Sequence, residues 1–286
     1  MGYGDDFIAT AQARVAKEKN PNSRVIIGDG NKIYPSIVYL NNPNIYQGEI
    51  SVNDTRNIWI KNYINNRPYI DHIKTNRERI YFNNNFSPAP GDIFFSKEED
   101  MKGLEVIKTA KKIWETQFKK ISKFVVMIEP NVKGPEYAKI IGSKIVGEAH
   151  LNRDWGFEKW QEVVNNLKDQ EAFIQCFKSK AKKLTSVIEA DSNFRMAVSI
   201  MKNCDLFVGT NGGLIQAAAA INKPAINILG GWISPKVIGY KTHENFYIDD
   251  KKSPCGAKIR CQHCAECMSQ IKVDEVILSI LKILNK

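Results

Sequence analysis

The chain has 286 residues, of which 43% are hydrophobic and 25% are charged, and it carries a formal net charge of +10. This composition is ordinary for a soluble globular protein, and the length allows about two domains. No apolar run approaches the ~20 residues that a membrane-spanning helix needs. The N-terminal residues also lack the basic and apolar blocks of a signal peptide, so we expect a cytoplasmic protein.

The positive charge favours anionic partners such as nucleotides, nucleic acid or an acidic membrane face. Most of the excess, however, consists of lysine residues scattered along expected helices, and a solvated basic surface explains it equally well. The sequence contains neither the spacing of a zinc finger nor the aromatic motif of an RNA-binding domain. We therefore expect no nucleic-acid partner.

Short apolar strands alternate with helical stretches along the chain, which favours parallel sheets covered by helices. In the first part we expect helices over 7–19 and 102–121 and strands over 23–29, 35–40, 57–63 and 92–95. In the second part we expect strands over 123–130, 172–177, 185–189, 205–209 and 225–229, and helices over 157–169, 192–203, 213–222 and 274–285. A boundary near residues 118–123 divides the chain into domains 1–120 and 121–286.

Residues 204–231, CDLFVGTNGGLIQAAAAINKPAINILGG, form a distinctive unit. They predict a strand, a glycine-containing turn, an alanine-rich helix and a second strand that ends in two glycines. Glycines in the turn can adopt positive φ angles and let a ligand approach the backbone. The first N–H groups of the following helix lack partners within the helix and can bind a phosphate. A purely structural turn is the alternative interpretation.

Three further segments accompany this unit: MGYGDDFIAT at 1–10, IEPNVKG at 128–134 followed by NRDWGFEKWQEVV at 152–164, and the cysteine-rich stretch 253–276. Together, and in this order, they resemble glycosyltransferase family 9, the lipopolysaccharide heptosyltransferase-like enzymes. The resemblance covers the C-terminal half well and the N-terminal half at its first ten residues. In that family the Gly-Asp loop follows a β-strand, which has no counterpart between Met1 and this loop.

The resemblance implies an α/β protein of the GT-B type, in which two Rossmann-like domains with parallel sheets face each other. It implies an inverting glycosyltransferase that moves a sugar from a nucleoside-diphosphate sugar to the hydroxyl of a glycan or glycolipid acceptor, in surface glycan or lipopolysaccharide assembly. No cofactor is expected at the reaction centre. The expected location is the cytoplasm, with at most peripheral contact at the inner membrane face.

Two aspartates compete for the role of general base, which removes the proton of the acceptor hydroxyl. In the family this aspartate stands four residues before a threonine, and counting back from Thr10 gives Asp6. Asp5 preserves the literal Gly-Asp dipeptide with Gly4 and is the second candidate. The structural alternative is an aspartate N-cap for a helix that begins near Phe7.

The resemblance also implies a donor site that stabilises the leaving diphosphate. Arg153 takes the place of the family's basic residue two positions before the loop tryptophan, Trp155, and Lys133 is a weaker candidate. A surface arginine near a helix start is the alternative for Arg153. The family often has Asp where Asn211 stands and His where Gln216 stands. The remaining residues implied at the donor site are Asn211, Gly212, Gly213, Leu214, Gly230 and Gly231.

Four of the six cysteines are clustered within segment 253–268: Cys255, Cys261, Cys264 and Cys267. In a cytoplasmic protein this spacing suggests a structural Zn²⁺ ion or an iron–sulfur cluster more than disulfides. Free or paired thiols are the alternative, and His263 is a substitute ligand. Cys176 and Cys204 lie in or beside apolar elements and are expected in the core.

Two other functional classes stay open. A protein of the same fold that binds nucleotide sugars without turnover would fit Asn211 and the strand without a counterpart before the Gly-Asp loop. A Rossmann-type oxidoreductase is disfavoured, because no G-x-G-x-x-G sequence follows an expected strand and opens a helix. Release of nucleoside diphosphate separates the enzyme from the binding protein.

Overall fold

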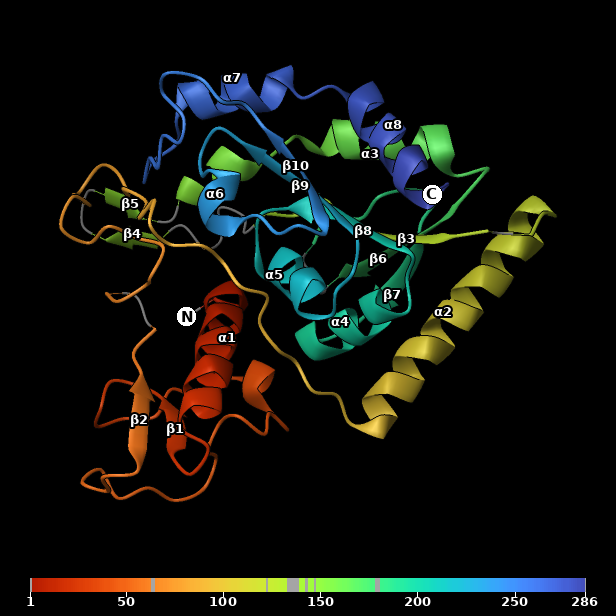
Figure 1. The fold of residues 1–286 in the computed structure, drawn as a ribbon. Coiled ribbons are helices and arrows are strands. Elements are labelled where there is room, and N and C mark those ends of the chain that lie inside the picture. Colours follow the sequence, from red (N-terminus) through yellow and green to blue (C-terminus); the bar gives the residue numbers. More distant parts are fainter. Residues whose placement is uncertain are drawn as a thin grey trace.

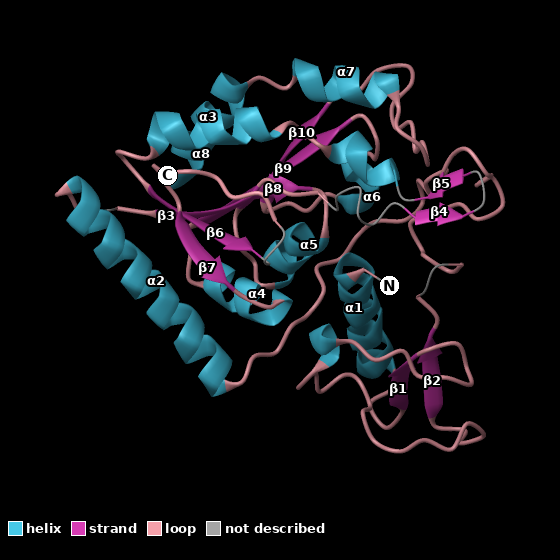
Figure 2. Ribbon diagram, turned by 180° about the vertical axis from the view of Figure 1, so that it is seen from behind, coloured by secondary structure: helices cyan, strands magenta, loops and turns pink. Residues whose placement is uncertain are grey.

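A six-stranded parallel sheet organises the C-terminal half of the chain (Figures 1 and 2). The computed structural model describes residues 2–62, 65–121, 123–132, 139–141, 144–146, 148–177 and 181–285. The strands follow the order β10-β9-β8-β3-β6-β7. Their bounds are β3 Val125–Glu129, β6 Ala172–Phe177, β7 Ile188–Asp191, β8 Leu206–Thr210, β9 Ala225–Gly230 and β10 His243–Tyr247.

Two helical layers cover this sheet. Val126 and Ile128 of β3 pack with α3 (Phe157–Leu167) and α8 (Val273–Leu284), whereas Val125 and Met127 pack toward the other layer. That second layer consists of α2 (Lys97–Phe118), α4 (Phe194–Lys202) and α5 (Gly213–Ala220). All four β3 residues are fully buried. The continuous apolar run in the sequence therefore reflects a strand that is covered on both faces.

The strand order reverses between β3 and β8. From β3 the chain continues to β6 and β7 on one side, and it then returns to build β8, β9 and β10 on the other. Sheets of this kind bind ligands outside the carboxyl ends of the strands, at the point where the order reverses. The fold thus positions Glu129 and the turn after Thr210 at the edge where a ligand is expected.

The N-terminal unit is small. It contains α1 (Tyr3–Lys19), a parallel pair of strands, β1 (Arg24–Ile27) and β2 (Asn57–Ile60), and the 3₁₀ helix η1 (Ile37–Tyr39). The predicted strand over 35–40 is wrong, because the Ser36 hydroxyl accepts a hydrogen bond from the Val38 amide and starts η1 instead. Residues 92–95 are also not a strand. Their backbone is held by side chains, including Thr10 and Arg195.

Several shorter elements complete the described part of the chain: β4 (Lys139–Ile141), β5 (Lys144–Val146), η3 (Glu148–Arg153), α6 (Pro235–Ile238) and α7 (Gln262–Gln270). Strands β4 and β5 form an antiparallel hairpin. None of the helices in the described residues is both long and apolar enough to cross a bilayer.

Helix α2 packs on the large sheet although it precedes the predicted boundary. Gly103 permits its close approach to α4, since a Cβ atom there would lie 2.2 Å from the Ser199 hydroxyl oxygen. Arg195 of α4, with a side chain only 6% exposed, forms an ion pair with Glu99 of α2. The same guanidinium donates to the carbonyls of Ile37 and Phe94. A domain division near residue 120 stays a prediction.

His243 opens β10 as a buried neutral side chain. It is 8% exposed, and neither ring nitrogen has a hydrogen-bond partner within the described residues. Burial lowers the pKa of His243 to about 4 from the ordinary 6.5. In the unfolded chain His243 therefore becomes protonated below pH 6.5, whereas in the folded chain it becomes protonated only near pH 4.

We expect the stability to fall as the pH drops through this window. A difference of 2.5 pKa units corresponds to about 3 kcal/mol of unfolding free energy, fully present above pH 6.5 and lost near pH 4. Urea unfolding at several pH values should show a flatter pH dependence for His243→Phe, whereas His72→Phe at an exposed position should behave as the parent. An equal slope in parent and His243→Phe would contradict the assignment.

Candidate functional site

The turn between β8 and α5 lies at the edge of the sheet where we expect a ligand. Its glycines, however, do not adopt the expected positive φ angles. Gly212, the N-cap of α5, has φ −175° and ψ −167°, an extended conformation that other residues also adopt. Gly213 instead leaves room for α1, since a Cβ atom there would lie 3.2 Å from both the Tyr3 Cβ and the Phe194 ring. The expectation of positive φ in this turn is therefore wrong. Close helix packing explains Gly213.

Arg153 reaches this turn from the end of η3. Its Nη1 donates to the Asn211 carbonyl at 2.9 Å, and its guanidinium lies over the Trp232 ring, 5.1 Å from the ring centroid. A second guanidinium nitrogen contacts the His150 ring. Burial lowers the pKa of Arg153 to about 10, so the side chain stays cationic at neutral pH. The structure thus brings together two residues of the predicted donor site, Arg153 and Asn211.

Asp5 lies in the first turn of α1 and its carboxylate is fully partnered. Arg67 Nη2 pairs with Oδ2 at 2.8 Å, and the Tyr69 hydroxyl donates to Oδ1 at 2.7 Å. Asn62 donates to the Asp5 carbonyl at 2.9 Å. The negative charge of Asp5 acts electrostatically on Arg153 and favours its charged form. The first turn of α1, which carries Asp5, packs against the Gly212–Gly213 turn, next to the Asn211 carbonyl that Arg153 binds.

Asp6 points into the N-terminal unit instead. The Ser36 hydroxyl donates to its Oδ2 at 2.7 Å and the Tyr39 hydroxyl donates to its Oδ1 at 3.0 Å. Burial raises the pKa of this carboxyl above its ordinary value. Neither aspartate is the N-cap, because α1 begins at Tyr3 and Gly2 holds that position. The alternative of an aspartate cap is wrong, and the two carboxylates have separate environments.

The other predicted donor residues are distributed more widely. Leu214 is a packing residue that contacts the core between α4 and α5. Gly230 has φ +62° and, with Gly231, packs against α7, where a Cβ atom on Gly231 would lie 2.5 Å from the Cys267 sulfur. Lys133 lies outside the described residues. The sequence did not indicate Arg67, Tyr69 and Trp232 as site residues. Arg67 and Tyr69 lie in a segment without a recognisable motif, whereas Trp232 could have been found because it directly follows the Gly230–Gly231 pair.

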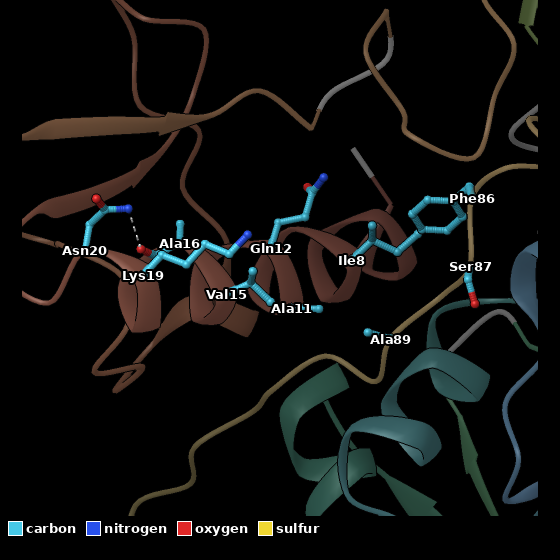
Figure 3. A pocket seen from close by; sticks show the side chains of 10 residues that line it. All are labelled: Ile8, Ala11, Gln12, Val15, Ala16, Lys19, Asn20, Phe86, Ser87 and Ala89. Carbon is cyan, nitrogen blue, oxygen red and sulfur yellow. Dashed lines mark hydrogen bonds between the residues drawn. The ribbon is translucent and has the colours of Figure 1, made fainter.

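An apolar groove of about 440 Å³ runs along α1 (Figure 3). Its wall begins at Ile8, one helical turn after Asp5, and continues through Gln12 and Val15 to Lys19. Phe86 forms part of the opposite wall, and its ring lies 6.3 Å from that of Tyr69, the residue that hydrogen-bonds Asp5. Gln12 Oε1 is buried without a hydrogen-bond partner in the described part of the chain. The groove thus extends from the Asp5 end of α1 over an apolar surface.

The cysteine-rich segment brings potential metal ligands together. One ligand atom from each of Cys255, Cys261, His263 and Cys264 lies within 4.8 Å of the others, and the Cys255 sulfur is 2.9 Å from Cys264 and 3.9 Å from Cys261. A tetrahedral ion with metal–sulfur bonds of ~2.3 Å separates its sulfurs by roughly 3.8 Å. The cluster can therefore hold a single metal ion.

The group of four potential ligands differs from the predicted four-cysteine set at one residue. His263 joins Cys255, Cys261 and Cys264, whereas Cys267 forms a second group with Asp250 and the same His263. The Cys267 sulfur is 3.3 Å from His263 Nε2, and Asp250 is 2.8 Å from the same nitrogen. All six cysteines are free thiols, and Cys176 and Cys204 are buried as expected. A ring nitrogen bonded to Asp250 leaves the second ring nitrogen for other contacts.

Comparison with known proteins gave structural matches only. No family model matches the chain, and no curated protein sequence matches it. The structure is similar to that of a glycosyl transferase family 9 protein from Veillonella parvula, with a TM-score of 0.61 and 11% identity over 99% of this chain and 95% of that one. This match confirms the GT-B-like α/β fold and, at the level of fold, the resemblance to family 9.

Two weaker matches come from Escherichia coli. ADP-heptose lipopolysaccharide heptosyltransferase II gives a TM-score of 0.43 and 15% identity over 68% of this chain and 53% of that one. The iron-containing dodecameric glycosyltransferase TibC gives a TM-score of 0.41 and 14% identity over 57% of this chain and 45% of that one. The chain covers about half the length of these two proteins.

Proposed function

We propose that this protein is a family 9 glycosyltransferase that moves a sugar from a nucleoside-diphosphate sugar to an acceptor hydroxyl, with inversion and without a metal at the reaction centre. The observation that carries the proposal is the packing of the first turn of α1, which carries Asp5, against the Gly212–Gly213 turn, whose neighbour Asn211 accepts a hydrogen bond from Arg153. The fold shared with the Veillonella parvula protein supports it.

Arg153 would bind the diphosphate of the donor. A guanidinium can grip two phosphate oxygens at once, and its charge persists because the pKa stays at about 10. The adjoining N-terminus of α5 adds a favourable field for an anion. Both groups then stabilise the charge that develops on the leaving diphosphate.

Asp5 is the better candidate for the base than Asp6. Its carboxylate is bound by Arg67 and Tyr69 and acts electrostatically on Arg153, whereas that of Asp6 is bound by Ser36 and Tyr39 of the N-terminal unit. A carboxylate paired with arginine is a weak base, so its contribution would depend on position more than on basicity. Asp6 would hold α1 against η1.

The groove along α1 is the place where we expect the acceptor. It begins one turn from Asp5, and its walls include the apolar side chains of Ile8, Val15 and Phe86. A glycolipid acceptor, with a sugar hydroxyl near Asp5 and an apolar part along α1, fits this lining better than a fully polar glycan. Assembly of a surface glycan or lipopolysaccharide would supply such an acceptor.

We expect Asp5→Asn to lower turnover by ~10²–10⁴-fold, the usual contribution of general acid–base catalysis, with donor affinity nearly unchanged. Release of nucleoside diphosphate in the presence of acceptor is the measurement. Asp6→Asn is the matched control and should mainly lower thermal stability. Full activity of Asp5→Asn together with an inactive Asp6→Asn would identify Asp6 as the general base. Full activity of both variants would show that neither aspartate takes part in the reaction.

Arg153→Ala should weaken binding of nucleoside diphosphate by roughly 1.5–3 kcal/mol, which corresponds to about 10- to 150-fold in Kd. Titration calorimetry measures this effect directly. Arg56→Ala, which removes an exposed arginine paired with Asp54, serves as the control and should leave the affinity intact. Equal affinities for the parent and Arg153→Ala would exclude Arg153 from the donor site.

We further propose that the cluster of Cys255, Cys261, His263 and Cys264 binds one structural Zn²⁺ ion. The short distances among the ligand atoms favour a single ion over an iron–sulfur cluster. Elemental analysis of protein purified without added metal should find about one equivalent. Cys264→Ala should lose the ion and melt at a lower temperature, whereas Cys176→Ala should keep it. A metal-free parent with the same melting temperature after chelation would refute the site.

A further inference from the structure

Exposed apolar side chains and cations gather on one protruding loop and the segment beside it. Ile73 is 97% exposed and Tyr81 is 42% exposed on loop 71–81, and Ile259 is 59% exposed on segment 257–260. The loop and the segment are joined by backbone hydrogen bonds, from Ile80 to Gly256 and from Lys258 to Glu78. We call these two stretches the 71–81/257–260 surface. Apolar tips of this kind mark interaction sites when they occur together.

The 71–81/257–260 surface is basic. It contains two acidic residues, Asp71 and Glu78, and five basic residues, so its net charge is +3. The basic residues are Lys74, Arg77, Arg79, Lys258 and Arg260. Lys74 pairs with Asp71 at 3.5 Å, and Lys258 bonds the Asn76 carbonyl. Arg77 and Arg79 are exposed. This charge would attract a partner of opposite charge.

We propose that this surface docks the protein on an anionic lipid bilayer. A bilayer with acidic headgroups attracts the cations and also accepts exposed isoleucine and tyrosine side chains at its interface. The phosphate backbone of a nucleic acid would attract the cations but would gain nothing from an isoleucine that is 97% exposed. The combination of charge and protruding apolar side chains favours the bilayer.

The position of this surface relative to the candidate site supports the proposal. Asn152, which precedes Arg153, donates to the carbonyls of Ala257 and Ile259 and accepts from the Cys261 amide. Phe82 packs edge-on against Trp232, the ring that lies under the Arg153 guanidinium. Docking here would thus hold the donor site close to the bilayer. The benefit to a glycolipid acceptor rests on the proposed function, whereas lipid binding itself does not.

Vesicle flotation with the full chain tests the proposal. Vesicles of phosphatidylglycerol and phosphatidylethanolamine should carry the protein, and vesicles of phosphatidylcholine alone should not. Binding should weaken as the salt concentration rises, because the attraction between exposed charges is screened. Neither nucleotide nor acceptor is present, so the outcome is independent of glycosyl transfer. Donor affinity, measured by calorimetry on the same variants, should remain unchanged.

Substitutions in the 71–81/257–260 surface test whether this surface is the one that binds the vesicles. Arg77→Gln/Arg79→Gln should weaken binding about 30-fold, since each basic residue near an anionic bilayer contributes about 1 kcal/mol. Ile73→Ser should weaken it about tenfold through the loss of apolar burial. Matched controls lie on and just after α2, on the opposite side of the molecule (Figure 1): Lys108→Gln/Lys112→Gln, and Ile121→Ser at a residue 86% exposed. These controls should bind as the parent does.

Any of four outcomes would overturn the proposal. The parent fails to float with anionic vesicles at low salt, or it floats equally well with phosphatidylcholine. Alternatively, the α2 controls lose binding while the Ile73 and arginine variants keep it, which would assign the lipid surface to the other end of the molecule. Retention of an oligonucleotide but not of vesicles at physiological salt would identify a nucleic-acid surface instead.

Discussion

The contact between the first turns of α1 and α5 is the constraint on which the rest of the structure depends. Gly4 packs on Gly213, and the Tyr3 ring stacks on Phe194 with centroids 4.1 Å apart. Two helix N-termini thus meet, and their dipoles create a field that favours negative charge. Asp5 and Asp6 supply part of that charge from within the protein. The diphosphate of the proposed donor would meet the same field, so acidic side chains and the proposed donor site can share one corner of the fold.

Much of the large sheet could be predicted from the sequence, because its central strands are apolar runs bounded by turns. The strands over 172–177, 205–209 and 225–229 agree closely with β6, β8 and β9. Edge strand β10, HENFY, was missed since polar residues interrupt its pattern. Residues 35–40 are equally apolar yet form η1, because the Ser36 hydroxyl offers the backbone a local partner. An apolar run fails to predict a β-strand where a side chain offers the backbone a local hydrogen-bond partner.

Only those residues of the candidate site that belong to a sequence motif could be predicted. The basic residue before Trp155 and the turn at Asn211 were identified, and the Arg153–Asn211 hydrogen bond joins them. The sequence analysis ranked Asp6 before Asp5 as the base, and the proposed function reverses this order, because neighbouring helix residues point ~100° apart and only tertiary contacts distinguish them. Those contacts come from Arg67 and Tyr69, in an irregular loop without periodicity.

Arg195 has a consequence for motion. From α4 it binds Glu99 of α2 and the carbonyls of Ile37 and Phe94, so one buried guanidinium ties the N-terminal unit and the connecting chain to the large sheet. Rotation of one unit against the other would strip a buried cation of these partners, at a cost of ~3–5 kcal/mol. The Arg195 contacts therefore oppose rotation of the N-terminal unit against the large sheet. In the proposed glycosyltransferase, substrate entry and product exit would then depend on loop movement more than on rotation of the two units.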